Sequence, residues 1–139
     1  MGRTWTTEET RPLSTPWRQA VVLKVVDADT LDLRIDLGFD VQIVSRIRLM
    51  AEGALPEGAP STVDAWEQRG PERELGKVAT ARVEVLCPFG SVVRVYSAKG
   101  GSRGKYGRWL AVILYRDGTE WHSLGDTLLA EGHADIPTY

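Results

Sequence analysis

The chain has 139 residues, which fits a single domain, and 42% of them are hydrophobic, enough for a core. The net charge of −2 argues against a protein that is basic throughout, as many nucleic-acid-binding domains are. No apolar run approaches the ~18 residues of a membrane-spanning helix, so we expect no membrane partner. The lone Cys87 excludes an internal disulfide. Without a signal peptide, the sequence as written predicts a cytoplasmic protein, or a secreted one if a signal has been removed.

The first fifty residues predict an arm followed by three strands. Residues 1–19 contain prolines and threonines and no apolar run, so we expect an N-terminal arm there and one folded domain over residues 20–139. Gly38-Phe39 is expected to turn the chain. β-branched runs and apolar–polar alternation predict strands over residues 20–26, 31–35 and 41–49.

The remaining residues complete a recognisable architecture. Glycine and proline predict a loop over residues 50–66, and apolar spacings of three and four predict a helix from Pro71 to Leu86. Two strands, 91–96 and 109–115, and a short helix, 123–131, follow. Five strands with a helix between the third and fourth predict an α+β, mainly β fold. This is a five-stranded OB-fold Greek-key barrel with two to three helices.

Two short motifs carry residue types that suit phosphodiester chemistry. Asp27 and Asp29 follow the first predicted strand, and in extended chain their carboxylates point the same way, which favours a divalent cation between them. The same residues also suit a plain turn with side-chain to backbone bonds. The second motif is Lys105-Tyr106-Gly107-Arg108-Trp109, whose arginine suits two-point binding of phosphate. It lies in a basic cluster, which is otherwise typical of a solvated surface: Arg94, Lys99, Arg103, Lys105 and Arg108.

These two motifs, in this order, resemble the staphylococcal-nuclease (thermonuclease) family over roughly residues 20–139. The family's first strand ends in Asp-Gly-Asp-Thr, whose second aspartate binds Ca²⁺. The resemblance therefore implies that Asp29, with Asp27 beside it, holds Ca²⁺. In the family's Lys-Tyr-Gly-Arg, the arginine binds the scissile phosphate and the lysine and tyrosine contact a terminal phosphate. These roles fall on Arg108, Lys105 and Tyr106.

The middle motif of the family is Arg-Leu-x-Gly-Ile-Asp-(Thr/Ala)-Pro-Glu. Here Arg48-Leu49 matches its start and Pro56-Glu57 its end, which implies that Arg48 contacts phosphate and Glu57 the attacking water. Arg46, on the same strand face, is a second candidate for the arginine. No aspartate stands in the second metal-binding position between these ends. Glu52 is the only nearby carboxylate and is assigned that role.

Three functions remain open at this point. The first is a Ca²⁺-dependent nuclease, a hydrolase of DNA or RNA with little sequence specificity, because such sites bind backbone rather than bases. The second is a non-catalytic OB module that binds nucleic acid or a protein through a charged groove, since one metal ligand is missing. The third is a structural or assembly domain, which the acidic net charge and the N-terminal arm permit.

Overall fold

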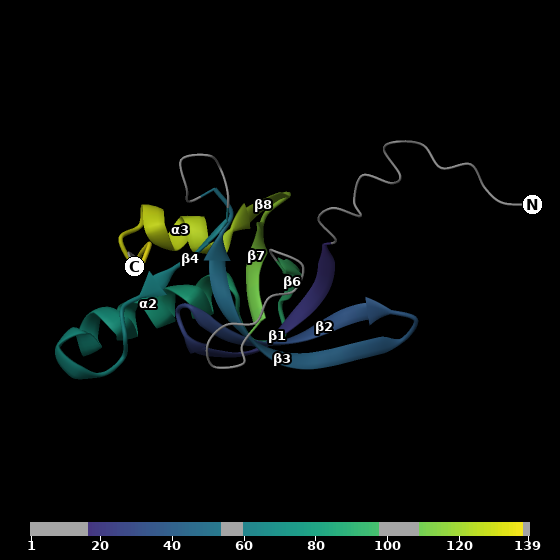
Figure 1. Cartoon of the computed structure of the whole chain (residues 1–139), viewed down its shortest axis with the longest axis horizontal. Helices are drawn as coiled ribbons and strands as arrows, with labels where there is room; N and C mark the ends of the chain where they lie inside the picture. The colour runs from purple at the N-terminus through teal and green to yellow at the C-terminus, as the bar shows by residue number, and fades with distance from the viewer. Residues whose placement is uncertain (1–16, 54–59, 98–108, 138–139) are drawn as a thin grey trace, which may run out of the picture.

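Five long strands form the body of the molecule (Figure 1). The computed structural model describes residues 17–53, 60–97 and 109–137, and the statements below concern these residues. Apolar side chains alternate along each long strand and point into a shared core. The strands are β1 (Arg18–Asp27), β2 (Thr30–Gly38), β3 (Val41–Ala51), β6 (Val92–Ser97) and β7 (Trp109–Asp117).

The strands close into a barrel. Their hydrogen-bonded order is β3-β2-β1-β6-β7, and β3 pairs with β7 in parallel from Ile47 opposite Trp109 to Met50 opposite Val112. All other pairs between these strands are antiparallel. This is the connectivity of an OB-fold-like barrel, so the predicted mainly β fold class is confirmed.

Two α-helices and several short elements cover the barrel. In Figure 1 both helices lie at one end of the barrel, away from the tip of the β2–β3 hairpin. α2 (Arg73–Leu86) continues from the 3₁₀-helix η2 (Gly70–Glu72), in which Pro71 occupies the first turn, as predicted. α3 (Leu124–Ala130) is capped by the Ser123 hydroxyl, which accepts from the Asp126 backbone N–H. The short strands are β4 (Ser61–Thr62), β5 (Asp64–Ala65), β8 (Glu120–Ser123) and β9 (Ala134–Asp135).

The core lies inside the barrel and beneath α2. Gly76 of α2 packs against the backbone at Glu67, where any β-carbon would clash. Cys87 ends the same helix and is fully buried, and burial raises the pKa of its thiol to about 12. Little thiolate therefore forms at neutral pH, and we assign Cys87 a packing role. Fully buried side chains that fill the core include Val22, Leu31, Leu33, Ile47, Leu49, Val83, Ile113, Leu124 and Leu128.

Two local details differ from the expectation. The region expected as a loop, 50–66, contains the short strands β4 and β5, because Met50 and Ala51 pair with Thr62 and Ser61. β8 was also missed, since its residues were too few to show alternation. Within the described residues, no helix is long and apolar enough to cross a membrane.

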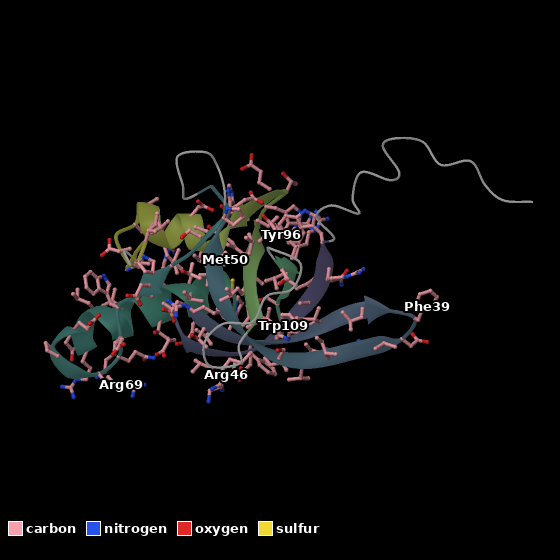
Figure 2. All side chains as sticks on the ribbon, in the orientation of Figure 1. Phe39, Arg46, Met50, Arg69, Tyr96 and Trp109 are labelled. Atoms are coloured by element: carbon pink, nitrogen blue, oxygen red, sulfur yellow. The ribbon has the colours of Figure 1, made fainter. Side chains whose placement is uncertain are left out.

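The β2–β3 hairpin projects from the barrel and carries Phe39 at its tip (Figure 2). The turn lies at Phe39-Asp40, one residue later than expected. Both residues have positive φ, 53° and 61°. Such backbone suits the twist of a hairpin but costs an ordinary L-residue about 1–2 kcal/mol. The Phe39 side chain is fully exposed and gives no packing in return.

Phe39→Asn is therefore expected to raise the free energy of unfolding by about 1 kcal/mol, because asparagine tolerates the left-handed region. Chemical denaturation monitored by circular dichroism measures the change. Phe89→Asn is the matched control, since Phe89 is also exposed and its φ is not positive. Equal effects of the two substitutions would show that the turn is not strained.

Candidate active site

A cavity of ≈ 450 Å³ opens beside the turn between β1 and β2. Its volume lies in the range of sites for small ligands. The β1–β2 turn, the outer face of β3 and the segment after β4 supply its walls. Acidic and basic side chains alternate around it: Asp27, Asp29, Arg46, Arg48, Asp64, Glu67 and Arg69.

Asp29 stands in the tight turn that joins β1 to β2, where Asp27 pairs with Thr30. Its Oδ1 accepts from the Thr30 hydroxyl at 2.9 Å, and its Oδ2 accepts from the Ala65 backbone N–H at 3.1 Å. Ala28, where the family has glycine, does not have a positive φ, so alanine fits this turn without strain. The carboxylate is thus held in one orientation between two parts of the chain.

Arg48 crosses the cavity wall from β3. Its Nε and Nη2 both donate to the Val63 carbonyl, at 3.2 and 2.8 Å. The same Nη2 lies 3.8 Å from Asp29 Oδ2 and 3.7 Å from Asp64 Oδ1. One guanidinium nitrogen therefore stands between two carboxylates that are far apart in sequence. The Arg48 side chain is mostly buried, at 18% exposed, so its charge is only partly screened by water.

Asp64 and Glu67 reach the cavity because the chain returns to it after β4. Val63 donates its backbone N–H to the Leu49 carbonyl, and β5 pairs with β9. Trp66 donates its Nε1–H to the Gly132 carbonyl at 3.1 Å, which fixes the segment against the C-terminal region. Asp64 is 63% exposed, so its carboxylate is open to solvent.

Asp27 also faces the cavity, but its carboxylate has a protein partner. Gln68 Nε2 donates to Asp27 Oδ1 at 2.7 Å and to the Val26 carbonyl at 3.1 Å. Asp27 and Asp29 therefore both tie the β1–β2 turn to residues 65–68. The two sequence interpretations of this motif, a turn and a cavity of carboxylates, both describe it.

Arg46 lines the cavity but is held by a different partner. Its Nε and Nη2 bind the two oxygens of Asp32 at 2.8 and 3.1 Å, and these bonds raise the pKa of the Arg46 guanidinium. Asp32 faces Arg46 directly across the β2–β3 pair. Of the two candidate arginines, only Arg48 lies between Asp29 and Asp64.

Glu52 lies elsewhere. It does not line the cavity; its Oε2 accepts from the Tyr96 hydroxyl at 3.5 Å, and its backbone N–H donates to Asp126 Oδ2 at 2.7 Å. Burial and the neighbouring Glu52 carboxylate raise the pKa of Tyr96. The structure thus brings together Asp27, Asp29 and Arg48 and leaves Glu52 apart. The other predicted site residues, Glu57, Lys105, Tyr106 and Arg108, lie outside the described residues.

The described part of the cavity was tested against the ligands of a divalent cation. No group of three or more histidine, cysteine or carboxylate side chains suited to a metal ion occurs in the part of the chain that the structure describes. Asp29 and Asp64 nevertheless offer two carboxylates on one cavity, both within 4 Å of the same positively charged nitrogen. Hard cations such as Ca²⁺ accept carboxylate, carbonyl and water oxygens together, so this pair fits part of such a shell.

Comparison with known proteins gives no relative that would decide the question. No protein-family model matches the chain, and no curated protein matches it. The assignment of this cavity therefore depends on its own geometry.

Sequence reasoning missed Asp64 and Glu67, although a signal was present. Asp64-Ala65-Trp66-Glu67 has the spacing of the Asp-(Thr/Ala)-Pro-Glu end of the motif discussed above, with tryptophan in place of proline. The search for this end stopped at Pro56-Glu57, immediately after Arg48. The structure shows that residues 50–62 form an excursion through β4 before the chain returns to Arg48.

Proposed function

We propose that the protein is a Ca²⁺-dependent nuclease that hydrolyses phosphodiester bonds of DNA or RNA with little sequence specificity. The observation that carries this proposal is the position of Arg48, whose Nη2 lies between the carboxylates of Asp29 and Asp64 in a charged cavity. A cation-binding pair next to a guanidinium is the combination that holds a phosphate from two sides.

Each residue has a role that its contacts support. Asp29 and Asp64 replace the earlier pair of Asp29 and Glu52 as ligands for Ca²⁺, and Asp27 orients the turn through Gln68. When bound, Ca²⁺ would neutralise charge on the phosphate oxygens. Arg48 donates to the non-bridging oxygens of the scissile phosphate. Arg108 is proposed as a second donor on the basis of its motif, with Lys105 and Tyr106 on a terminal phosphate.

Glu67 takes the role first assigned to Glu57. It lines the cavity together with Asp64, three residues before it, whereas Glu57 lies outside the described residues. In the proposed reaction the Glu67 carboxylate accepts a proton from a water molecule as that water attacks phosphorus. The new P–O bond forms in line with the bond to the 5′ oxygen, which breaks and leaves.

Glu67→Gln is expected to lower kcat for cleavage about 10²-fold, because general-base catalysis typically contributes that much or more. Glu57→Gln is the matched control and should change kcat little. Single-turnover cleavage of a labelled oligonucleotide at saturating Ca²⁺ gives both values. The reverse order of effects would return the role to Glu57.

The proposal is tested by incubating the purified protein with end-labelled single-stranded DNA and RNA in Ca²⁺, in Mg²⁺ and in EDTA. Cleavage in Ca²⁺ that stops in EDTA supports a nuclease. Salt-dependent binding without cleavage would favour the alternative, an OB module that binds nucleic acid. Neither cleavage nor binding at low salt would favour a structural or assembly domain.

A further inference from the structure

The β2–β3 hairpin leaves one edge of β3 without a neighbour. Residues 41–46 of β3 pair with β2 on one side, and among the described residues no strand pairs with their other side. β7 begins to pair with that edge only at Ile47. In Figure 1 this part of the hairpin extends beyond the barrel. An open strand edge carries a row of unpaired backbone N–H and C=O groups, which accept another strand.

The side chains along this edge do not prevent such pairing. Natural edge strands are usually protected by charges, prolines or bulges, but Val41-Gln42-Ile43-Val44-Ser45 contains no charge and no proline. Val41, Ile43 and Val44 are 51%, 37% and 68% exposed, although all are strongly β-forming. Leu37, at the end of the facing strand, adds to the exposed apolar surface.

The edge is complementary to itself in antiparallel register. If two copies meet at Ile43, then Val41 faces Ser45, Gln42 faces Val44, and Asp40 faces Arg46 of the other copy, by the spacing of the sequence alone. The opposite charges of Asp40 and Arg46 therefore meet twice across the two-fold axis. Arg46 is free to do this, since Asp32 occupies only its Nε and Nη2 and half of its side chain is exposed.

We propose that residues 40–46 form a homodimer interface in which β3 pairs with β3 of a second copy, antiparallel about Ile43. The free edge has the length that this register needs, because it ends where β7 begins to pair at Ile47. The result is a continuous β2-β3-β3-β2 sheet with closed two-fold symmetry. An open edge in each copy is thereby covered.

A cysteine at the two-fold axis tests the register. Directly opposite residues in antiparallel strands have Cα atoms about 4.5–5.5 Å apart, which a disulfide spans. Ile43→Cys is therefore expected to form a disulfide-linked dimer under mild oxidation, seen on a non-reducing gel. Val41→Cys is the matched control and should stay monomeric, because residue 41 of one copy is four positions from residue 41 of the other. The native Cys87 is buried and takes no part.

Sedimentation velocity of the unmodified chain tests the dimer itself, from about 10 to about 200 µM protein. We expect the dimer fraction to rise with concentration. Asp40→Arg should shift the dimerisation constant by at least tenfold toward monomer, since it places two arginine pairs across the axis. Glu84→Arg makes the same change of charge on the exposed face of α2 and should leave the constant unchanged.

Two results would overturn the proposal. One is a monomer at every concentration, which would leave the edge for another protein's strand or for none. The other is equal cross-linking of Ile43→Cys and Val41→Cys, which indicates random collision rather than a fixed register. Circular dichroism of each variant confirms that it is folded before the comparison is made.

Discussion

Asp64→Asn is expected to lower the rate of Ca²⁺-dependent cleavage by about 10³-fold, because loss of an anionic ligand removes several kcal/mol of charge stabilisation. The substitution keeps the size of the side chain, and Asp64 is 63% exposed, so the fold should be unaffected. The Ca²⁺ concentration for half-maximal rate should rise at least tenfold in parallel, since affinity follows the charge of the ligands. Initial rates across a Ca²⁺ titration measure both quantities.

Glu52→Gln is the control for this result. Glu52 is the carboxylate that the sequence motif pointed to, but its side chain contacts Tyr96 rather than the cavity. Its rate and Ca²⁺ dependence should match those of the unmodified protein. A loss of Ca²⁺ affinity in Glu52→Gln with none in Asp64→Asn would reverse the assignment.

Arg48→Lys is expected to lower kcat/KM by about 10²–10³-fold, since a fixed guanidinium aimed at developing charge contributes that much. Lysine keeps the charge but lacks the planar set of donors that binds two phosphate oxygens at once. The substitution should also lower the free energy of unfolding by about 1–3 kcal/mol, because the Val63 carbonyl loses both donors in a mostly buried setting.

Arg46→Lys separates this effect from a general loss of positive charge. Arg46 lies two residues earlier on β3 and its guanidinium binds Asp32 instead. Its kcat should change by less than about threefold, as expected for an exposed ion pair of small energy. Equal losses in Arg46→Lys and Arg48→Lys would mean that the cavity needs only net positive charge.

The barrel was predictable because its information is local. Alternation in 31–35 and 41–49, the spacing of apolar residues before Leu86 and the turn residues between strands are each readable within a short window. The buried face of β2 and β3 near the barrel followed this pattern. It failed toward the hairpin tip, where Val41 and Ile43 are exposed because the hairpin extends past the core.

The site was only half predictable, because it depends on contacts between distant segments. Asp29 and Arg48 were found from short motifs, and they do lie on one cavity. Asp64 and Glu67 were missed because residues 50–62 separate them from Arg48, and nothing in the sequence measures how far such an excursion carries the chain. Only the bond from Arg48 to the Val63 carbonyl shows that the chain returns.

The central claim is that Asp29 and Asp64 together bind a divalent cation, and calorimetric titration of Ca²⁺ into the substrate-free protein tests it most directly. We predict one site with a Kd of about 10⁻⁴–10⁻³ M, as suits a site with few charged ligands. The Asp29→Asn/Asp64→Asn double variant, shown to be folded by circular dichroism, should give no binding heat. Unchanged Ca²⁺ binding in that variant, or no binding by the unmodified protein, would contradict the claim.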